Sequence, residues 1–555
     1  MLARFRDIAE LPATDFCVIG AGPAGIALSL ALAASGHSVL LIESGEETPD
    51  ASTSELTQAQ IRNTQTHAPA EIAACRAFGG TSWWWGGRCV PFDKIDFEDR
   101  SYAAGTQWPI SYDEIRIWHP KVAEFFGCGS GEFEKDPGIW SGLGEVSARG
   151  LERWTPTPNL NRTFIERVRQ SDSITLLLGA TLTDIELAAD KTRIRTLTLA
   201  DRGKTKKLDV QACVLACGGL ETTRIMLVAN RKYPTLFQHS KSVLGRFYMG
   251  HISGKIADVV LDNPASIAEL DFFKENDHFA RRRFTLQEDT LKKEELINIA
   301  FWIDNPPFYN ASHGNGILSA VWLMLAIPFI GRRLVSEGVR ISHVGPAPFQ
   351  ITLHLKNIYR SPITVARTAV QLLRDRYLSS PRKPGFLVRN RGGRYALHYH
   401  AEQLPMKSSS VSLSEKRDSL GVPRLVVDFK YSERDAQSVV RAHEVLDRSL
   451  REAKIGHLEF RAPREHLVSS VLAQASDGFH QLGTTRMSLD PSAGIVDQNC
   501  RVHGLENLFL VSGSVFPSSG QANPTFLVVA LALRLAGHLA STTARLATRS
   551  SLTAT

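Results

Sequence analysis

The chain has 555 residues, of which 43% are hydrophobic, and its 64 Lys and Arg against 57 Asp and Glu give a net charge of +7. A chain this long buries a large core without disulfide support. Its seven cysteines are odd in number and scattered, which argues against a disulfide framework and predicts reduced thiols in the cytoplasm. No internal repeat or low-complexity tract is apparent, and the N-terminus lacks the long apolar core of a secretory signal.

The first predicted elements are a buried strand, a glycine turn and a helix near the N-terminus. Gly20 permits the tight turn, Gly22 lets backbone approach a pyrophosphate, and Gly25 lets helix and strand pack closely. A second strand is predicted over residues 38–42, and Glu43 at its tip is placed to accept hydrogen bonds from ribose hydroxyls. This order favours dinucleotide binding over the alternative, a glycine turn in an ordinary βαβ unit.

The remaining elements predict a discontinuous organisation. Residues 1–235 are expected to form the first part of a dinucleotide domain, which includes a Gly- and Trp-rich loop at 76–97 and a strand over 174–182. The glycine motifs then stop, so residues 236–474 are expected to form a second domain. Residues 475–545 return to the first domain.

The segment 316–391 stands apart within the second domain. Residues 316–331 are apolar and uncharged, but they are short for a transmembrane helix and contain Pro328. Residues 332–391 hold 12 Lys or Arg against two acidic residues, and an amphipathic helix is predicted to start at 361. This order is typical of proteins that rest on an anionic membrane face. A lid with a solvated basic surface is the alternative, and no motif supports nucleic-acid binding.

Several motifs, taken together in this order, resemble the glucose-methanol-choline (GMC) family of FAD-dependent oxidoreductases, nearest to its pyranose oxidase and bacterial sugar dehydrogenase branch. The resemblance is carried by residues 15–25, 76–87, 92–97, 214–221, 245–251, 480–487, 496–509 and 523–525. The C-terminal motifs are the specific part, because many flavoproteins share the first one. The resemblance implies an α/β fold (α+β overall), with a Rossmann-type FAD-binding domain and a second, mixed-sheet substrate-binding domain.

The resemblance also implies which residues carry the chemistry. His480 matches the histidine of the family's HxxGT motif and Asn523 matches its partner, and the two face the reactive edge of the flavin in the family. An imidazole is suited to take a hydroxyl proton near neutral pH, and an amide can donate to the developing oxyanion.

The cofactor implied by the resemblance is FAD. Covalent pyranose oxidases bond it to a loop histidine, but Trp84 occupies that position here, so non-covalent binding is expected. The flanking Trp83 and Trp85 either pack in the core or wall the flavin or substrate site. No metal site is expected, since no other His or Cys cluster has ligand spacing. The expected FAD contacts are Gly20, Gly22, Ala24, Gly25, Glu43, Arg76, Gly79, Gly80, Thr81, Ser82, Leu182, Ala216, Gly218, Ser514 and Thr525.

The implied activity is oxidation of a CH–OH group, of a sugar or sugar-like alcohol, with a quinone, cytochrome or oxygen as electron acceptor. Two alternatives stay open: a lyase of the same fold without net redox change, and a flavin-binding protein without turnover. Residues 398–403 alternate like a strand that could line the substrate site, although a solvated sheet face is the simpler explanation for any one of them. A cytoplasmic location is expected, with peripheral contact to the inner membrane face through 316–391.

Overall fold

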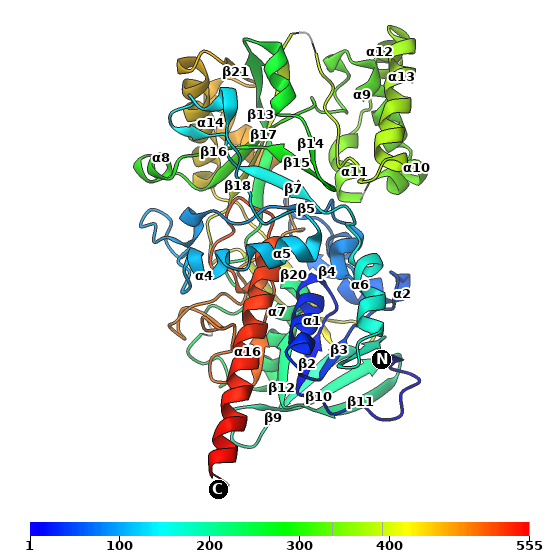
Figure 1. Cartoon of the computed structure of the whole chain (residues 1–555), viewed down its shortest axis with the longest axis vertical. Coiled ribbons are helices and arrows are strands. Elements are labelled where there is room, and N and C mark those ends of the chain that lie inside the picture. The colour runs from blue at the N-terminus through cyan, green and yellow to red at the C-terminus, as the bar shows by residue number, and fades with distance from the viewer. Residues whose placement is uncertain (241, 336, 391, 554–555) are drawn as a thin grey trace.

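The computed structural model describes residues 1–240, 242–335, 337–390 and 392–553. Two sheet-based lobes are stacked along its long axis (Figure 1). Ser336 and Arg391, which belong to the segment 316–391, lie outside the described residues.

The lower lobe in Figure 1 is built on a six-stranded sheet in which every pair of neighbours is parallel. Its central strands are buried along their whole length, because helices and loops cover both faces of a parallel sheet. In sheet order the strands are β1 (Leu2–Arg4), β8 (Ile174–Leu178), β3 (Val39–Ile42), β2 (Phe16–Ile19), β12 (Ala212–Leu215) and β22 (Leu508–Leu510).

Helices and a small meander complete this lobe. Helix α16 packs against α1 and then runs to the C-terminus at the lower end of the molecule (Figure 1). By length and composition Thr525–Thr542 of α16 could cross a membrane, but half of that stretch is buried inside the protein. The elements are α1 (Pro23–Ala34), α6 (Leu160–Arg169), α7 (Gly218–Lys232), α16 (Thr525–Thr553), β9 (Thr181–Leu187), β10 (Ile194–Asp201) and β11 (Lys204–Asp209).

The upper lobe is built on a second six-stranded sheet, and every pair of neighbours in it is antiparallel. Helices α14 (Glu433–Glu452) and α15 (Leu467–Gln474) pack on it and share its apolar core. In order the strands are β21 (Gly456–Phe460), β13 (His251–Leu261), β18 (Arg394–Glu402), β17 (Ile299–Asp304), β16 (Phe284–Leu286) and β6 (Val146–Ser147).

Two small sheets connect the lobes. One has the order β14-β15-β7-β5 and the other β19-β20-β4. Their strands are β14 (Phe273–Glu275), β15 (His278–Arg282), β7 (Leu151–Trp154), β5 (Arg88–Cys89), β19 (Ser410–Arg417), β20 (Pro423–Asp428) and β4 (Ala59–Ile61). Short helices α2 (Ala51–Ser54), α3 (Ala70–Ala73), α4 (Tyr112–Arg116), α5 (His119–Phe126) and α8 (Glu288–Lys293) lie in the loops.

The segment 316–391 folds into a helical module on one flank of the upper lobe (Figure 1). Helices α9 and α10 meet at an angle of 109°, so the apolar stretch of 316–331 is a broken helix and not a straight span. Pro328 causes the break, because proline has no backbone N–H to donate to the preceding helical turn. The module consists of α9 (Gly316–Ala326), α10 (Pro328–Leu334), α11 (Glu337–Val344), α12 (Ile351–Tyr359) and α13 (Pro362–Leu373).

The predicted α/β fold class with a Rossmann-type domain is confirmed. The predicted strand over 174–182 is instead two strands, because the left-handed backbone of Gly179 (φ +70°) separates β8 from β9. The second domain's large sheet is antiparallel throughout, and the mixed pairing lies in the small β19-β20-β4 sheet. Residues 146–154 fall within the predicted first domain, which ends at 235, but they pair with strands of the predicted second domain.

Candidate active site

A cavity of about 1990 Å³ runs from the carboxyl ends of the parallel strands to the underside of the antiparallel sheet. Ligands of open α/β sheets bind at this strand edge. Of the predicted site residues, those that line the cavity are Gly20, Gly22, Ala24, Glu43, Arg76, Gly80, Thr81, Ser82, Leu182, Ala216, Gly218, Thr525, His480 and Asn523. Gly25, Gly79 and Ser514 do not line it.

The N-terminus of α1 faces the cavity at its nucleotide end. Gly22 is the N-cap residue, no side chain caps the first turn, and no acidic residue lies in it, so its N–H groups are available to an anion. Gly25 lies behind this turn, where a Cβ would come within 1.9 Å of the Gly20 carbonyl oxygen. Gly25 therefore allows the close approach of helix and strand, and its contact with the cofactor stays a prediction.

Glu43 lies at the end of β3 and is buried against the turn. Its carboxylate accepts from the backbone N–H groups of Ala21 and Gly45, both at 2.9 Å. Burial raises the pKa of Glu43 above its ordinary value, although these hydrogen bonds oppose the shift. Each carboxylate oxygen has a second lone pair, so Glu43 can hold the turn and still accept from a ribose hydroxyl.

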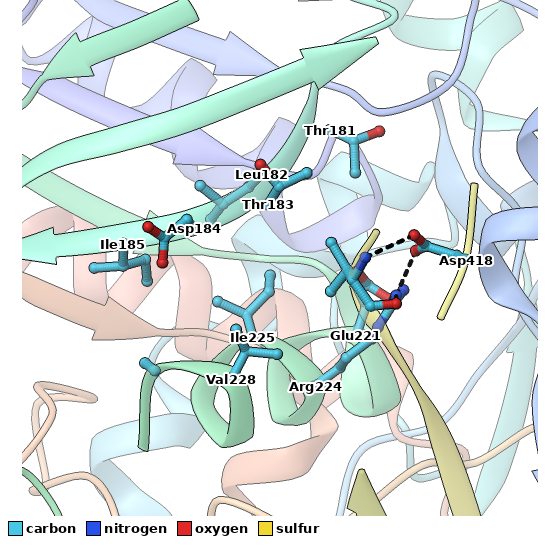
Figure 2. A pocket seen from close by; sticks show the side chains of 12 residues that line it. Thr181, Leu182, Thr183, Asp184, Ile185, Glu221, Arg224, Ile225, Val228 and Asp418 are labelled. Carbon is cyan, nitrogen blue, oxygen red and sulfur yellow. Dashed lines mark hydrogen bonds and ion pairs between the residues drawn. The ribbon is translucent and has the colours of Figure 1, made fainter. Parts of the chain in front are cut away.

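The far end of the cavity lies between β9 and α7, where Figure 2 shows a small side pocket. Leu182 lines both spaces. The wall is fixed by a buried pair between Arg224 and Asp418, and Glu221 lies 3.5 Å from the same guanidinium. Glu221 also pairs with Arg76 at 2.8 Å, so Arg76 is held at the cavity wall.

The loop that starts at Gly79 forms one side of the cavity. Gly79 has φ +97° and its N–H donates to the Ala21 carbonyl, which ties this loop to the glycine turn. A Cβ on Gly80 would lie 2.8 Å from the Gly22 Cα, so glycine is needed at position 80 where the two loops meet. The Ser82 hydroxyl donates to the Gly79 carbonyl and accepts from the Leu160 N–H, and it therefore fixes the loop on α6.

Trp83, Trp84 and Trp85 all line the cavity, which decides for a wall over simple core packing. Trp85 also packs on Phe126 and donates to the Pro158 carbonyl at 2.6 Å. At the C-terminal side, Ser514 lies behind the wall, where its hydroxyl bonds to Thr485 and Ser512. Ser512 and Gly513 line the cavity and Ser514 does not, so the contact of Ser514 with FAD stays a prediction.

These observations fit FAD. The uncapped α1 N-terminus and the glycine pair suit a pyrophosphate, Glu43 suits a ribose, and the long cavity has room for three fused rings beneath His480 and Asn523.

We expect Gly22→Val to abolish FAD retention without unfolding the protein. A Cβ on Gly22 would have only the Gly80 Cα within 4 Å, at 4.0 Å, so the first added carbon meets no clash. The valine side chain is expected to occupy the space for the pyrophosphate. The ratio of flavin to protein absorbance should fall to about a tenth or less. Gly142→Val is the control, because a Cβ there meets nothing within 4 Å and Gly142 does not line the cavity. Full flavin content in Gly22→Val would contradict the placement.

His480 and Asn523 meet on the cavity wall. The Asn523 Nδ2 lies 3.0 Å from the His480 Nε2, and the His480 side chain is 18% exposed. The Asn523 Oδ1 is buried and has no hydrogen-bond partner among the residues that the structure describes. A buried oxygen without a partner is costly, so this atom is available to a substrate hydroxyl.

A second histidine fixes the tautomer of His480. The Nε2 of His251 lies 3.2 Å from the Ser519 carbonyl oxygen and must donate to it. Burial lowers the pKa of His251, so its ring is neutral and its Nδ1 accepts from the His480 Nδ1 at 2.9 Å. The His480 Nε2 therefore carries the lone pair, and this is the nitrogen beside Asn523 at the cavity.

Asp477 holds this arrangement in place. Its Oδ1 accepts from the backbone N–H groups of Phe479 and His480. Its Oδ2 accepts from the backbone N–H of His251 at 2.7 Å and lies 3.1 Å from the His480 Nδ1. Burial alone would raise the pKa of Asp477, but His480 and the hydrogen bonds hold that pKa well below its ordinary range. Gly250 is required beside it, since a Cβ there would lie 2.6 Å from the Oδ2.

The motif match did not identify Asp477 or His251 as functional residues. Two signals were available: Asp477 precedes His480 by three positions, and His251 closes the motif over 245–251. His400 on β18 also faces this group, stacked on His251 at 4.3 Å, and its Nδ1 bonds to the Gln521 carbonyl at 2.7 Å. The rings of His251, His400 and His480 bring nitrogen atoms within 4.8 Å of one another, so these three could hold a metal ion. The expectation of no metal site stays a prediction.

Beyond the pair the cavity continues under β17 and β18. His398 and His400 of β18 line it, in line with the expected alternating strand. The His398 ring stacks on Trp302 at 4.4 Å, and burial lowers the pKa of His398 to about 4. Asp304 lies beside it and pairs with Lys255 at 2.8 Å. Polar groups and aromatic faces thus alternate along this wall.

Comparison with known proteins gives a consistent set of relatives. A family model described as GMC oxidoreductase matches residues 405–532, and one described as pyridine nucleotide-disulphide oxidoreductase matches residues 14–239. The chain is 21% identical to 2-methyl-1,2-propanediol dehydrogenase of Mycolicibacterium austroafricanum over 95% of each chain. It is 35% identical to paromamine 6'-oxidase of Streptomyces fradiae over 24% of each. The structure of pyridoxine 4-oxidase from Mesorbium loti shares the fold, with a TM-score of 0.53 and 17% identity over 94% of this chain and 98% of that one.

Proposed function

Because this chain belongs to the GMC oxidoreductases, FAD-dependent enzymes that oxidise CH–OH groups, we propose that its substrate is a sugar or sugar-like alcohol and that His480 takes the hydroxyl proton. The observation that carries this proposal is the 3.0 Å contact between the His480 Nε2 and the Asn523 amide on the wall of a flavin-sized cavity.

Each residue of the group has a separate task. The His480 Nε2 accepts the proton of the substrate hydroxyl, and Asn523 positions the same oxygen through its amide group. His251 and Asp477 keep the His480 ring in the tautomer whose Nε2 carries no proton. Bound FAD supplies the two-electron acceptor for the hydrogen that leaves the carbon. The Trp83–Trp85 wall and the overlying sheet limit access of water to this region.

The cavity wall supports a polyhydroxylated substrate. Aromatic faces such as Trp84, Trp154 and Phe272 line it together with hydrogen-bonding groups such as Asn305 and His398. A sugar ring presents apolar C–H faces and polar edges, and this mixture of groups suits both. The names of two relatives, 2-methyl-1,2-propanediol dehydrogenase and paromamine 6'-oxidase, support an alcohol as the substrate.

We propose further that the enzyme is a cytoplasmic dehydrogenase that passes its electrons to a quinone or cytochrome at the inner membrane face. The basic and apolar segment 316–391 supports this location, since it also contributes residues to the cavity wall.

An anaerobic screen of sugars and polyols tests the function. A true substrate should bleach the visible flavin band of the holoenzyme and yield the carbonyl product in equal amount. The same compound with the reacting hydroxyl methylated should leave the band unchanged, because it has no proton for His480 to take. Product formation without bleaching would favour the lyase alternative, and a complete screen without either would favour a flavin-binding protein without turnover.

A further inference from the structure

The helical module 316–391 carries most of the large apolar side chains that are exposed in the described part of the chain. Among the described residues, 20 large apolar side chains are exposed, and 14 of them lie in this module. Soluble surfaces rarely collect apolar side chains in one place unless something covers them. The 14 are Met324, Ile327, Phe329, Ile330, Ile341, Phe349, Ile351, Leu353, Leu355, Tyr359, Ile363, Val370, Leu373 and Leu378.

Helix α12 has apolar side chains on its exposed face and polar ones on its buried face. Ile351, Leu355 and Tyr359 recur every four residues along one exposed face, at 50%, 53% and 85% exposure. The buried side of the same helix carries His354, whose Nδ1 bonds to Ser319, and Asn357, which donates to the Ala311 carbonyl. A surface helix of a soluble protein has the opposite arrangement. Helix α12 is therefore built for an apolar environment on its outer face.

Cations lie among these apolar side chains. Lys356 lies on α12 and Arg360 directly follows it. Arg367 lies on α13 and Arg374 directly follows that helix, and all four side chains are exposed. The segment has 12 Lys or Arg and two acidic residues, whereas the whole chain has a net charge of only +7. An apolar face bordered by cations is complementary to an anionic lipid surface, with the side chains in the acyl boundary and the cations at the phosphates.

The same module forms part of the cavity wall. Helix α9 contributes Val321 and Met324, and α13 contributes Leu372 and Leu373. Met324 and Leu373 are also 38% and 52% exposed, so they lie where the cavity wall reaches the module's outer surface. Arg332 is exposed and lines the cavity as well. An entrance to the active-site cavity is thus framed by the exposed apolar and basic face.

We infer that α9–α13 dock the protein on an anionic phospholipid bilayer, with the cavity entrance at Met324 and Leu373 turned toward the lipid. The proposal rests on the proposed function only for what passes through that entrance. The docking itself rests on the exposed apolar face, its cations and the inverted helix α12. The broken α9–α10 pair lies at the surface as a re-entrant corner and does not span the bilayer.

Vesicle flotation of the holoenzyme tests the docking. We expect binding to vesicles of phosphatidylcholine with about 30% phosphatidylglycerol. Most of this binding should be lost when the vesicles are pure phosphatidylcholine or when the salt concentration is high. The triple variant Arg360→Glu, Arg367→Glu, Arg374→Glu should lower the partition coefficient by about a hundredfold or more. The matched control is Arg116→Glu, Arg202→Glu, Arg464→Glu, whose side chains are 61%, 59% and 82% exposed outside the module. This control should bind like the wild type.

The apolar face is tested by Ile351→Ser, Leu355→Ser, Tyr359→Ser, which should weaken vesicle binding while thermal stability and flavin content stay at wild-type values. Ile117→Ser and Leu489→Ser, at exposed positions outside the module, form its control. Failure of the wild type to float with anionic vesicles at low salt would overturn the inference. So would a dimer in solution that the α12 variant alone converts to monomer, since a second copy would then cover this face.

The two proposals fail separately. Loss of vesicle binding with substrate bleaching intact would remove the docking and leave the proposed function. Vesicle binding with no substrate found would leave the docking and remove the function.

Fluorescence gives a second test of the docking. The emission of a fluorophore on Ile363→Cys should shift to the blue on anionic vesicles, and that of one on Ile117→Cys should not. The unsubstituted protein, labelled in the same way, corrects for label on native cysteines.

Discussion

Replacing His480 by glutamine is expected to lower kcat for CH–OH oxidation by a factor of about 10²–10⁴, the usual contribution of a positioned general base. Glutamine can still bond to Asn523, but it cannot take the hydroxyl proton that the His480 Nε2 accepts. The rate of anaerobic flavin bleaching by substrate, followed by stopped flow, measures this step directly. Flavin content should not change, because His480 reaches the cavity at its catalytic end and not at the α1 turn.

The control for this variant is His457→Gln on β21, a histidine with 33% exposure that does not line the cavity. It should retain the wild-type bleaching rate. A His480→Gln enzyme with more than about half of the wild-type rate would show that another group takes the proton. His400 is then the candidate, because its ring lies 5.7 Å from the His480 ring and lines the cavity.

The predictable part of the site is the part fixed by local sequence patterns. The glycine turn, its following helix and the strand tip at Glu43 are consecutive in the chain, so their order alone predicted the nucleotide end. The pairing of His480 with Asn523 came from resemblance, since the two are 43 residues apart and no periodicity relates them. Their meeting follows from how the C-terminal segment returns along the parallel sheet.

The residues that hold His480 show what the patterns could not supply. Asp477 is close in sequence, but His251 lies 229 residues away on the first strand of the second domain's sheet. The short β6 strand at 146–147 likewise joins that sheet from the middle of the predicted first domain. Such pairings depend on tertiary topology, because a two-residue strand carries no recognisable period. Sequence patterns also could not show that Ser512 and Gly513 line the cavity while Ser514, in the same short turn, lies behind them.

The helical module was predictable in composition but not in the orientation of its helices. Its charge and apolar character were visible in the sequence, and they predicted contact with a surface. The inversion of α12 was not visible, because helical periodicity shows that a face is apolar but not whether that face turns inward or outward.

Asp477→Asn is expected to lower kcat by about 10²-fold or more and to lower stability as well. One oxygen of the Asp477 carboxylate accepts from two backbone N–H groups. The other accepts from the backbone N–H of His251 and lies beside the His480 Nδ1. An amide has a single acceptor oxygen, so its NH₂ group would face donors. The His480 ring would then lose its orientation or its tautomer. A merely structural role would lower stability without a change in the bleaching rate of the folded, flavin-loaded fraction.

The stability effect should depend on pH with a defined sign. The pKa of Asp477 is lower in the folded protein than its value of about 3.9 in an unfolded chain. The carboxylate therefore contributes its full stabilisation above that unfolded pKa and loses it as the pH falls through the folded pKa. We expect the difference in thermal midpoint between wild type and Asp477→Asn to be constant from pH 7 to 5 and to shrink below about pH 4. Asp113→Asn, with a side chain 81% exposed, should show no such difference at any pH. A difference that grows as the pH falls would contradict the buried, charged state of Asp477 on which the orientation of His480 depends.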